Sequence, residues 1–287
     1  MIVFGSIMGE WFTEASTYRH QASLSFKIDN VLCREKSSFQ EIFIFENAFF
    51  GRVMAIDGVT MLTTRDEFVY HEMIVHPAFS VCPGIQRVLV IGAGDGGTIR
   101  ELTRHPGVKT IDWVEIDGKV VELSQLYLPS LTIGNHDPRV NLMVRDGVSY
   151  IEEYSGEPYD LIIVDSTDPV GPGEGLFGTH FYRSCLDILG DEGIIVNQAE
   201  NPHYSPEWVT GINQKMQKIF PVFSFYQAFI PTYPSGHWLF GFGAKKGHPE
   251  TVIKEPSFVS DLKYYNAEIH KAAFALPNFV KDLLKGE

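Results

Sequence analysis

Three aspartates are the residues whose type and spacing are best suited to chemistry. Asp95 lies in a glycine-rich turn after one apolar run, and Asp165 and Asp168 follow another apolar run in a loop rich in proline and glycine. Carboxylates that converge on one cleft repel one another unless a positive charge lies among them. The loop lacks the regular oxygen spacing of a Ca²⁺ or Mg²⁺ site, which favours an organic cation over a metal. Turn formation by Asp165 and capping by Asp168 are the alternative roles.

The turn that carries Asp95 also has the form of a nucleotide-binding loop. The run VLVIGAGDGG at 88–97 is an apolar strand followed by glycines and a predicted helix. Glycines permit a tight turn and let a ligand approach the backbone beside a helix N-terminus. Gly92, Gly94 and Gly97 fit the dinucleotide pattern G-x-G-x-x-G, whereas Gly92, Gly94 and Gly96 fit the G-x-G-x-G of S-adenosylmethionine proteins. The glycines therefore predict a Rossmann-like ligand loop without choosing the ligand.

Further acidic residues end the next two predicted strands. Glu115 lies about 20 positions beyond the glycines, where an acidic residue accepts hydrogen bonds from ribose hydroxyls. Asp117 is predicted to cap the following helix. Asp146 ends the third strand and, since the carboxyl ends of parallel strands line one crevice, we expect it to face the adenine amino group of the same ligand. An N-cap of a helix over 148–154 is the alternative for Asp146, and one residue can do both.

The elements that must position these residues change character near residue 76. Before it, short β-rich runs separated by turn signals such as Asp57-Gly58 predict a small antiparallel sheet. After it, strands alternate with helical patterns, which is typical of βαβ units and of an α/β fold with a doubly wound, mostly parallel, Rossmann-like sheet of the methyltransferase type. The runs 223–230 and 238–244 predict an antiparallel hairpin at its end. We expect an N-terminal β-strand domain over 1–75 and a Rossmann-like catalytic domain over 76–287.

Composition narrows the classes of partner. Lys and Arg number 23 and Asp and Glu number 36, so the net charge is −13, which argues against a nucleic-acid backbone as the ligand. No run of about 18 apolar residues is present, and the first residues lack the basic segment and cleavage site of a signal peptide. The cysteines Cys33, Cys82 and Cys185 are widely spaced, which is typical of thiols in a reducing compartment. We expect a cytoplasmic protein that binds neither nucleic acid nor membrane.

Ordered motifs over nearly the whole chain resemble those of the polyamine aminopropyltransferases, the spermidine synthase family. They are DNVL at 29–32, IFEN at 44–47, GRVMAIDG at 51–58, DEFVYHE at 66–72, GAGDG at 92–96, VEID at 114–117, DG at 146–147, DSTDPVGP at 165–172, IPTY at 230–233, YN at 265–266 and AAFALP at 272–277. The resemblance implies an N-terminal β domain before a Rossmann-like domain, and a homodimer or homotetramer. It also implies decarboxylated S-adenosylmethionine as co-substrate, with no other cofactor and no metal. The implied reaction is transfer of the aminopropyl group to a diamine, usually putrescine, which yields spermidine and 5′-methylthioadenosine.

The resemblance also implies a role for each matching residue. Asp165 would be the catalytic residue beside the attacking amine. The donor would be held by Gln40, Gly92, Gly94, Glu115, Asp146, Gly147 and Pro172. The polyamine would be held by Tyr70, His71, Asp95, Asp165, Asp168 and Tyr233, and residues 166–175 would form a gate over both ligands. Without the resemblance, the two tyrosines read as core aromatics and His71 as a structural histidine.

The implied reaction is a direct displacement at a sulfonium, and its obstacle is protonation of the amine. An alkylamine resembles lysine, with a pKa of about 10.4, so neutralising it at pH 7 costs about 4.6 kcal/mol. A carboxylate is the natural acceptor of that proton. We expect Asp165 mainly to orient the amine lone pair and to relay the proton to water or to Tyr70. Asp95 and Asp168 would stabilise the positive charges and repel the carboxylate of ordinary S-adenosylmethionine.

Several alternatives stay open at this level. His203 replaces a tryptophan that many relatives carry near the distal end of the amine, which leaves cadaverine, agmatine and spermidine as alternative acceptors. Amine N-methylation by intact S-adenosylmethionine shares the architecture, and the three aspartates argue against it. A non-catalytic nucleoside-binding module and a nicotinamide dehydrogenase are the remaining alternatives.

Overall fold

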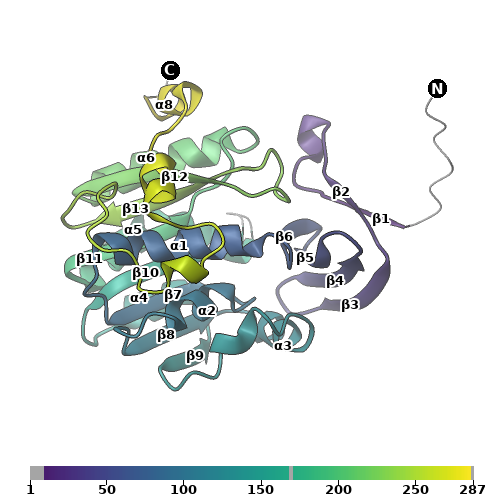
Figure 1. Ribbon diagram of the computed structural model, residues 1–287, viewed down its shortest axis with the longest axis horizontal. Helices are drawn as coiled ribbons and strands as arrows, with labels where there is room; N and C mark the ends of the chain where they lie inside the picture. Colours follow the sequence, from purple (N-terminus) through teal and green to yellow (C-terminus); the bar gives the residue numbers. More distant parts are fainter. Residues whose placement is uncertain (1–9, 168–170, 286–287) are drawn as a thin grey trace.

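The computed structural model describes residues 10–167 and 171–285, and Figure 1 shows a small β region beside a larger α/β body. The first strands, β1 (Trp11–Thr13) and β2 (Ser25–Lys27), pair antiparallel. A four-stranded antiparallel sheet follows in the order β3-β4-β5-β6. Its strands are β3 (Asn30–Lys36), β4 (Glu41–Asn47), β5 (Gly51–Ile56) and β6 (Val59–Thr63). The predicted antiparallel sheet is confirmed.

The hairpin between β5 and β6 shows how the sequence sets this sheet. Asp57 and Gly58 have φ values of 49° and 78°, the two positive values that a type I′ turn requires. They place Ile56 opposite Val59 in the register. Strand β4 lies inside the sheet, so alternate side chains pack on opposite faces. Its isoleucines face helix α3 (Gly118–Tyr127) and its phenylalanines face β1 and β2.

The larger body is built on a seven-stranded sheet in the order β12-β13-β11-β10-β7-β8-β9. Strands β11, β10, β7, β8 and β9 pair in parallel, and β13 pairs antiparallel with both β11 and β12, so that β13 alone runs opposite to the other six. This arrangement confirms the predicted α/β class and the terminal hairpin. The strands are β7 (Arg87–Gly92), β8 (Thr110–Glu115), β9 (Val140–Val144), β10 (Tyr159–Asp165), β11 (Leu189–Gln198), β12 (Val222–Phe229) and β13 (His237–Ala244).

Helices cover both faces of this sheet, because successive strand residues alternate between two apolar cores. Val88 and Val90 belong to the core under α1 and α2, whereas Leu89 and Ile91 belong to the core under α4, α5 and α6. The remaining helices are α1 (Glu67–Val81), α2 (Gly97–Thr103), α4 (Gly147–Glu153), α5 (Thr179–Ile188), α6 (Pro206–Ile219), α7 (Ala267–Ala273) and α8 (Asn278–Lys285). No helix in the described ranges has the length and apolar character needed to cross a bilayer.

Helix α1 links the two regions and lies in front of the large sheet in Figure 1. Fourteen of its fifteen residues are buried, so it shows no polar face from which an amphipathic helix could be recognised. The expected domain boundary at residues 75 and 76 falls inside this continuous helix. We propose instead that the division lies between Thr63, which ends β6, and Glu67, which begins α1.

The first parallel strand ends in a glycine that brings two segments of the site into contact. Gly92 pairs with Asp165 in the register of β7 and β10. Its φ is +88°, and a Cβ atom on it would lie 2.0 Å from the Asp165 carbonyl oxygen. The Ala93 N–H donates to that oxygen over 2.7 Å. A side chain at position 92 would therefore force the glycine-rich turn away from the end of β10.

This contact predicts that Gly92→Ala is strongly destabilising. The positive φ and the backbone clash together should lower the free energy of unfolding by at least about 2 kcal/mol. Urea denaturation of both proteins measures the difference. Gly84→Ala is the matched control, since a Cβ atom there meets nothing within 4 Å. Equal losses in the two variants would contradict the role assigned to Gly92.

Candidate active site

A single cavity collects most of the side chains that the sequence singled out. It runs along the carboxyl ends of β7, β8 and β10 and is bounded by β5, β6 and the loop between β12 and β13. The predicted residues that line it are Gln40, Tyr70, His71, Gly92, Gly94, Asp95, Glu115, Asp146, Gly147, Asp165 and Tyr233. Asp168 lies outside the described residues, as does the side chain of Pro172, whose backbone belongs to η3 (Gly171–Phe177). The expected gate over 166–175 is therefore described only in part.

Asp165, the last residue of β10, is a buried carboxylate with a partner on each oxygen. The Tyr70 hydroxyl donates to Oδ1 over 2.7 Å, and the Thr98 hydroxyl donates to Oδ2 over 2.6 Å. Burial and the charge of Asp95 raise the pKa of Asp165 to about 6, although His71 and the two hydroxyls act in the opposite direction. Burial and the charge of Asp165 raise the pKa of Tyr70 well above its usual value. Tyr70 therefore stays protonated and remains the donor in this hydrogen bond.

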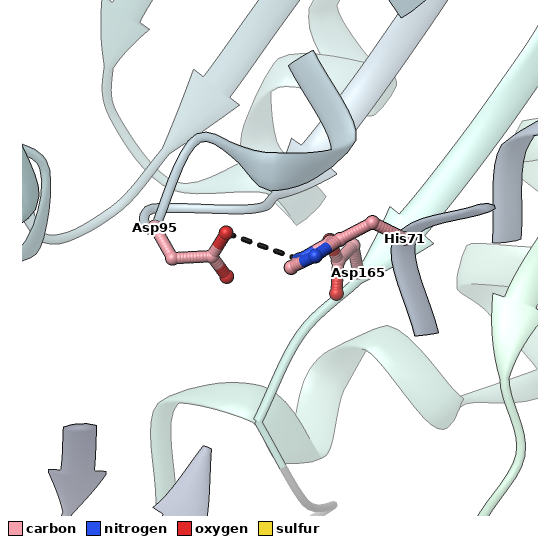
Figure 2. A group of neighbouring side chains, drawn as sticks. All are labelled: His71, Asp95 and Asp165. Carbon is pink, nitrogen blue, oxygen red and sulfur yellow. Dashed lines mark ion pairs between the residues drawn. The ribbon is translucent and has the colours of Figure 1, made fainter. Parts of the chain in front are cut away.

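Asp95 is held in a different way, by the imidazole of His71 (Figure 2). His71 Nε2 lies 3.1 Å from Asp95 Oδ1, which also accepts the Gly97 N–H over 2.7 Å. Burial lowers the pKa of His71, but the carboxylates of Asp95 and Glu67 outweigh it and the net pKa is about 10. The ring is therefore an imidazolium at neutral pH. Burial raises the pKa of Asp95, and the charge of His71 outweighs it, so that this pKa lies below its usual value.

His71, Asp95 and Asp165 bring their polar atoms within 4.8 Å of one another, so a metal ion must be considered. An imidazole ligates a metal through a nitrogen lone pair. In His71 one ring nitrogen faces Asp95 and the other faces Glu67 at 2.6 Å, and the imidazolium carries a proton on both. This donor set fits a cation that is held by carboxylates through hydrogen bonds better than a metal ion.

The last glycine of the loop, Gly97, makes room for the His71 ring. A Cβ atom on Gly97 would lie 2.3–2.5 Å from three atoms of the His71 ring. Only a glycine at the start of α2 lets the ring pack between this helix and α1. The G-x-G-x-x-G spacing therefore reflects packing of a side chain at its last position.

The nucleoside-type side of the cavity is formed by Glu115 and its neighbours. Burial, reinforced by the charges of Asp117, Asp165 and Asp95, raises the pKa of Glu115 to about 7. Its Oε1 accepts the Asp117 N–H over 2.8 Å. Asp117 also accepts the Lys119 N–H, which confirms the predicted helix cap, and the Gln40 amide over 3.0 Å. Gln40 belongs to the turn between β3 and β4, so the small sheet contributes directly to the cavity.

Asp146 both caps a helix and lines the cavity, the two roles considered for it from the sequence. Its side chain accepts the Ser149 N–H over 2.7 Å as the N-cap of α4, and it also lines the cavity. Gly147, next to it, is required for packing, since a Cβ atom there would lie 2.5 Å from the Ile91 side chain.

Comparison with known proteins agrees with this geometry. Residues 67–255 match the spermine/spermidine synthase domain, and residues 10–64 match the spermidine synthase tetramerisation domain. The chain belongs to the spermine/spermidine synthase family. It is 48% identical to the polyamine aminopropyltransferase of Clostridium perfringens over 96% of this chain and 98% of that protein, and 46% identical to that of Alkaliphilus metalliredigens over the same shares.

Solved structures of the family have the same fold. A spermidine synthase crystallised with the transition-state analogue AdoDATO has a TM-score of 0.90 at 39% identity, covering 98% of this chain and 96% of that one. The spermidine synthase of Thermotoga maritima has a TM-score of 0.86 at 36% identity, covering 97% and 95%. This aminopropyltransferase thus shares its whole architecture with spermidine synthases.

Several residues in or behind the wall of the aminopropyltransferase cavity were not predicted from the sequence. Glu67 accepts a hydrogen bond from His71 Nδ1 over 2.6 Å, and its place four positions before His71 on one helix could have indicated it. Thr98 binds Asp165, but an isolated threonine in the first turn of a helix carries no such signal. Glu14 also lines the cavity and is buried. Glu200, which lies in the stretch with His203 that was expected near the distal end of the amine, lines the cavity as well. Glu14 lies far from the other motifs, and only the fold brings it to the site.

The two aromatic positions that were uncertain now have defined surroundings. Tyr233 lines the cavity, its hydroxyl donates to the Met61 carbonyl over 2.7 Å, and its ring meets Trp238 edge to face. His203 is exposed and packs against Phe279 of α8, with ring centroids 4.7 Å apart. His203 is not among the residues that line the cavity, so its difference from the usual tryptophan changes the surface beside the cavity.

The buried charge of Glu115 predicts a pH-dependent gain in stability for Glu115→Gln. Because its pKa is raised from 4.5 to about 7, the folded chain holds this proton more tightly than the unfolded chain does, and stability is lost as the pH rises through about 7. The glutamine keeps the acceptor for the Asp117 N–H and removes the charge. Its stabilisation should be larger at pH 8 than at pH 5 by about 2 kcal/mol.

Urea denaturation at both pH values measures this difference. Glu122→Gln is the control, because this carboxylate lies on the same stretch of chain, in α3, and its side chain is 64% exposed. A gain for Glu115→Gln that does not change with pH would contradict the buried ionisation.

Proposed function

We propose that the enzyme transfers the aminopropyl group of decarboxylated S-adenosylmethionine to putrescine, giving spermidine and 5′-methylthioadenosine. The observation that carries the proposal is the pair of differently held carboxylates, Asp95 and Asp165, at the mouth of a nucleoside-type cavity. The similar spermidine synthase that was solved with a transition-state analogue supports the same choice of reaction.

The donor half of the cavity suits an adenosine sulfonium. Glu115 lies at the strand end where ribose hydroxyls are bound in Rossmann-like folds, and Asp146 lies at the next strand end. Gly92 and Gly94 let the ligand approach the backbone of the loop, and Gln40 closes the cavity from the small sheet. Pro172 would contact the donor and Asp168 would contact the amine, as the family resemblance implies. No other cofactor takes part in the proposed reaction.

The acceptor half carries more negative charge than one ammonium needs. Asp95 and Asp165 would hold the amine that reacts, together with Tyr70 and Tyr233. Glu14 and Glu200 line the same cavity from other elements, and they would bind a second ammonium. Glu200 has a φ of +72°, a strained conformation for a residue with a side chain and one that clusters at functional sites. A diamine satisfies both sets of carboxylates.

Asp165 suits the role of proton acceptor. With a pKa near 6, it is mostly ionised at pH 7 and yet more basic than an exposed aspartate. The amine nitrogen forms a bond to the aminopropyl carbon while the carbon–sulfur bond breaks and its electron pair returns to sulfur. The proton of the amine passes to Asp165 and then to water. Tyr70 fixes the carboxylate, and alignment of nitrogen and carbon supplies much of the rate.

The same charges select the donor and distinguish the second candidate reaction. Ordinary S-adenosylmethionine carries a carboxylate that Asp95 would repel. Since the imidazolium of His71 is engaged by Glu67 and Asp95, it does not offset that repulsion. Mass analysis of the product separates the reactions, because N-methylation adds a methyl group and the proposed reaction adds an aminopropyl group.

We further propose a homo-oligomer that assembles through the small sheet, in a reducing cytoplasm. The family's tetramerisation domain covers residues 10–64, and this region exposes Val31 and Phe49. The three cysteines are unpaired thiols, as expected in such a compartment.

Asp165→Asn tests the proposed chemistry. The variant should bind 5′-methylthioadenosine as the wild type does and lose about 10²- to 10⁴-fold in kcat at pH 7, because the proton acceptor is gone. The loss should shrink towards pH 9 to 10, where more of the amine is neutral. Calorimetry measures nucleoside binding, and the pH dependence of kcat measures the rest. Unchanged turnover at pH 7 would refute the role of Asp165.

Glu200→Gln tests the second ammonium site. It should raise the KM for putrescine about tenfold, the typical loss of a hydrogen bond to a charged group. The monoamine n-butylamine is the matched control, since it has no second ammonium and should react equally well with both proteins. Cadaverine, agmatine and spermidine complete the panel. Equal losses for putrescine and n-butylamine would place the second ammonium elsewhere.

A further inference from the structure

A buried row of alternating charges extends from Asp95 away from the cavity. His71 Nε2 faces Asp95 at 3.1 Å and His71 Nδ1 faces Glu67 at 2.6 Å. The Arg100 guanidinium then binds both Glu67 oxygens, over 3.0 and 2.8 Å, and its Nε donates to Glu101 over 2.8 Å. Every carboxylate in the row therefore lies between positive groups or directly beside one.

Arg100 does not reach the ligand cavity, and its contact closest to the site is the one to Glu67. Its side chain is 13% exposed and is not among the residues that line the ligand cavity. The two-pronged contact fixes the plane of the Glu67 carboxylate, as bidentate arginine pairs do. Glu101 is fixed in turn by His76 and Arg104, at 3.1 and 3.2 Å. The guanidinium is thus anchored at both ends.

Only one of the two carboxylate oxygens of Asp95 is bound by the protein. Oδ1 forms the ion pair with His71 and accepts the Gly97 N–H. Within the described part of the chain, Oδ2 has no hydrogen-bond partner. Figure 2 draws the ion pair with His71 from one of the two Asp95 oxygens only. One oxygen is therefore used to hold the carboxylate, and the other is available to a ligand.

We propose that Arg100 and Glu67 are positioning residues that hold His71 as an imidazolium and thereby aim Asp95 Oδ2 at the acceptor ammonium. This inference rests on the proposed function for its substrate. Glu67, in the wall of the cavity, and Arg100, behind it, would thus affect the affinity for the amine by positioning other groups.

The groups around His71 favour a positive charge on its ring. Glu67 from α1, Asp95 from the loop before α2 and Asp165 from β10 are acidic, and Tyr70 packs its ring edge against the imidazole. Arg100, from α2, lies on the other side of Glu67, and its charge is balanced by its contacts to Glu67 and Glu101. Without Arg100, Glu67 would still attract the charge of His71, but it would lose the two contacts that fix the plane of its carboxylate, so the position of His71 Nδ1 would no longer be set.

Steady-state kinetics of three variants test the role of Arg100. Arg100→Gln should lower kcat/KM for putrescine at least about tenfold while the KM for the donor stays within about twofold, because only Asp95 is misplaced. Arg100→Lys should recover part of the loss, since it keeps the charge but not the two-pronged contact. Arg104→Gln is the matched control: it removes a cation from Glu101 on the same helix without touching Glu67, and because His76 still binds Glu101, any loss of kcat/KM should stay within about twofold.

Nuclear magnetic resonance of ¹⁵N-labelled histidine tests the charge itself and does not depend on catalysis. The His71 signal, assigned by its loss in His71→Gln, should remain that of an imidazolium from about pH 6 to 9 in the wild type. In Glu67→Gln the charge should be lost between about pH 7 and 9, and kcat/KM for putrescine should fall over the same range.

Each outcome decides the proposal. A neutral His71 in the wild type at pH 7.5 overturns it even if Arg100→Gln fails to fold. Equal effects of Arg100→Gln on donor and acceptor, or an effect of Arg104→Gln as large as that of Arg100→Gln, reduce Arg100 to a structural residue and also overturn it. If the wild type does not use putrescine, the proposed function fails instead, and the His71 spectrum still reports the charge.

Discussion

An ionised carboxylate that leaves water loses several kcal/mol of solvation, which only opposite charges and hydrogen bonds can replace. Asp95, Glu115 and Asp165 lie around one cavity at the carboxyl edge of the large sheet. The cost of burying their charges determines which groups must lie beside each of them. Asp95 is compensated by an imidazolium, so its charge is secure. Asp165 is compensated by two hydroxyls and keeps a raised pKa, and Glu115 by one backbone N–H. Neighbouring carboxylates thereby differ in their pKa, which is lowered for Asp95 and raised for Asp165, as the proposed division between holding charge and accepting a proton requires.

Helix α1 supplies most of this compensation. It presents Glu67, Tyr70 and His71 to the cavity, and the next residue, Glu72, accepts three backbone N–H groups of residues 263–265 over 2.8 to 2.9 Å. A helix that is polar at these points and apolar elsewhere can be buried on all sides. It therefore ties the small sheet, the site and the C-terminal segment into one unit.

Much of the fold followed from local patterns. The apolar strand before the glycine loop, the hairpin of the runs 223–230 and 238–244 and the turn at Asp57-Gly58 were all predicted, because buried parallel strands are continuous apolar runs and type I′ turns need particular residues. Helix α1 and strand β3 were missed. Burial on every side removes the helical period from α1, and β3 (NVLCREK), largely exposed at the edge of its sheet, has no clear alternation.

The sequence by itself determined the α/β class, the glycine loop and the acidic strand ends, since these depend on residues close together in the chain and on the rule that parallel strands share one carboxyl edge. Only the tertiary structure decided what charge each acidic residue can carry. It placed His71 between Glu67 and Asp95, gave Gly97 the task of making room for that ring, and turned His203 towards α8. Charge and contact depend on neighbours from other elements, and a linear pattern does not record those neighbours.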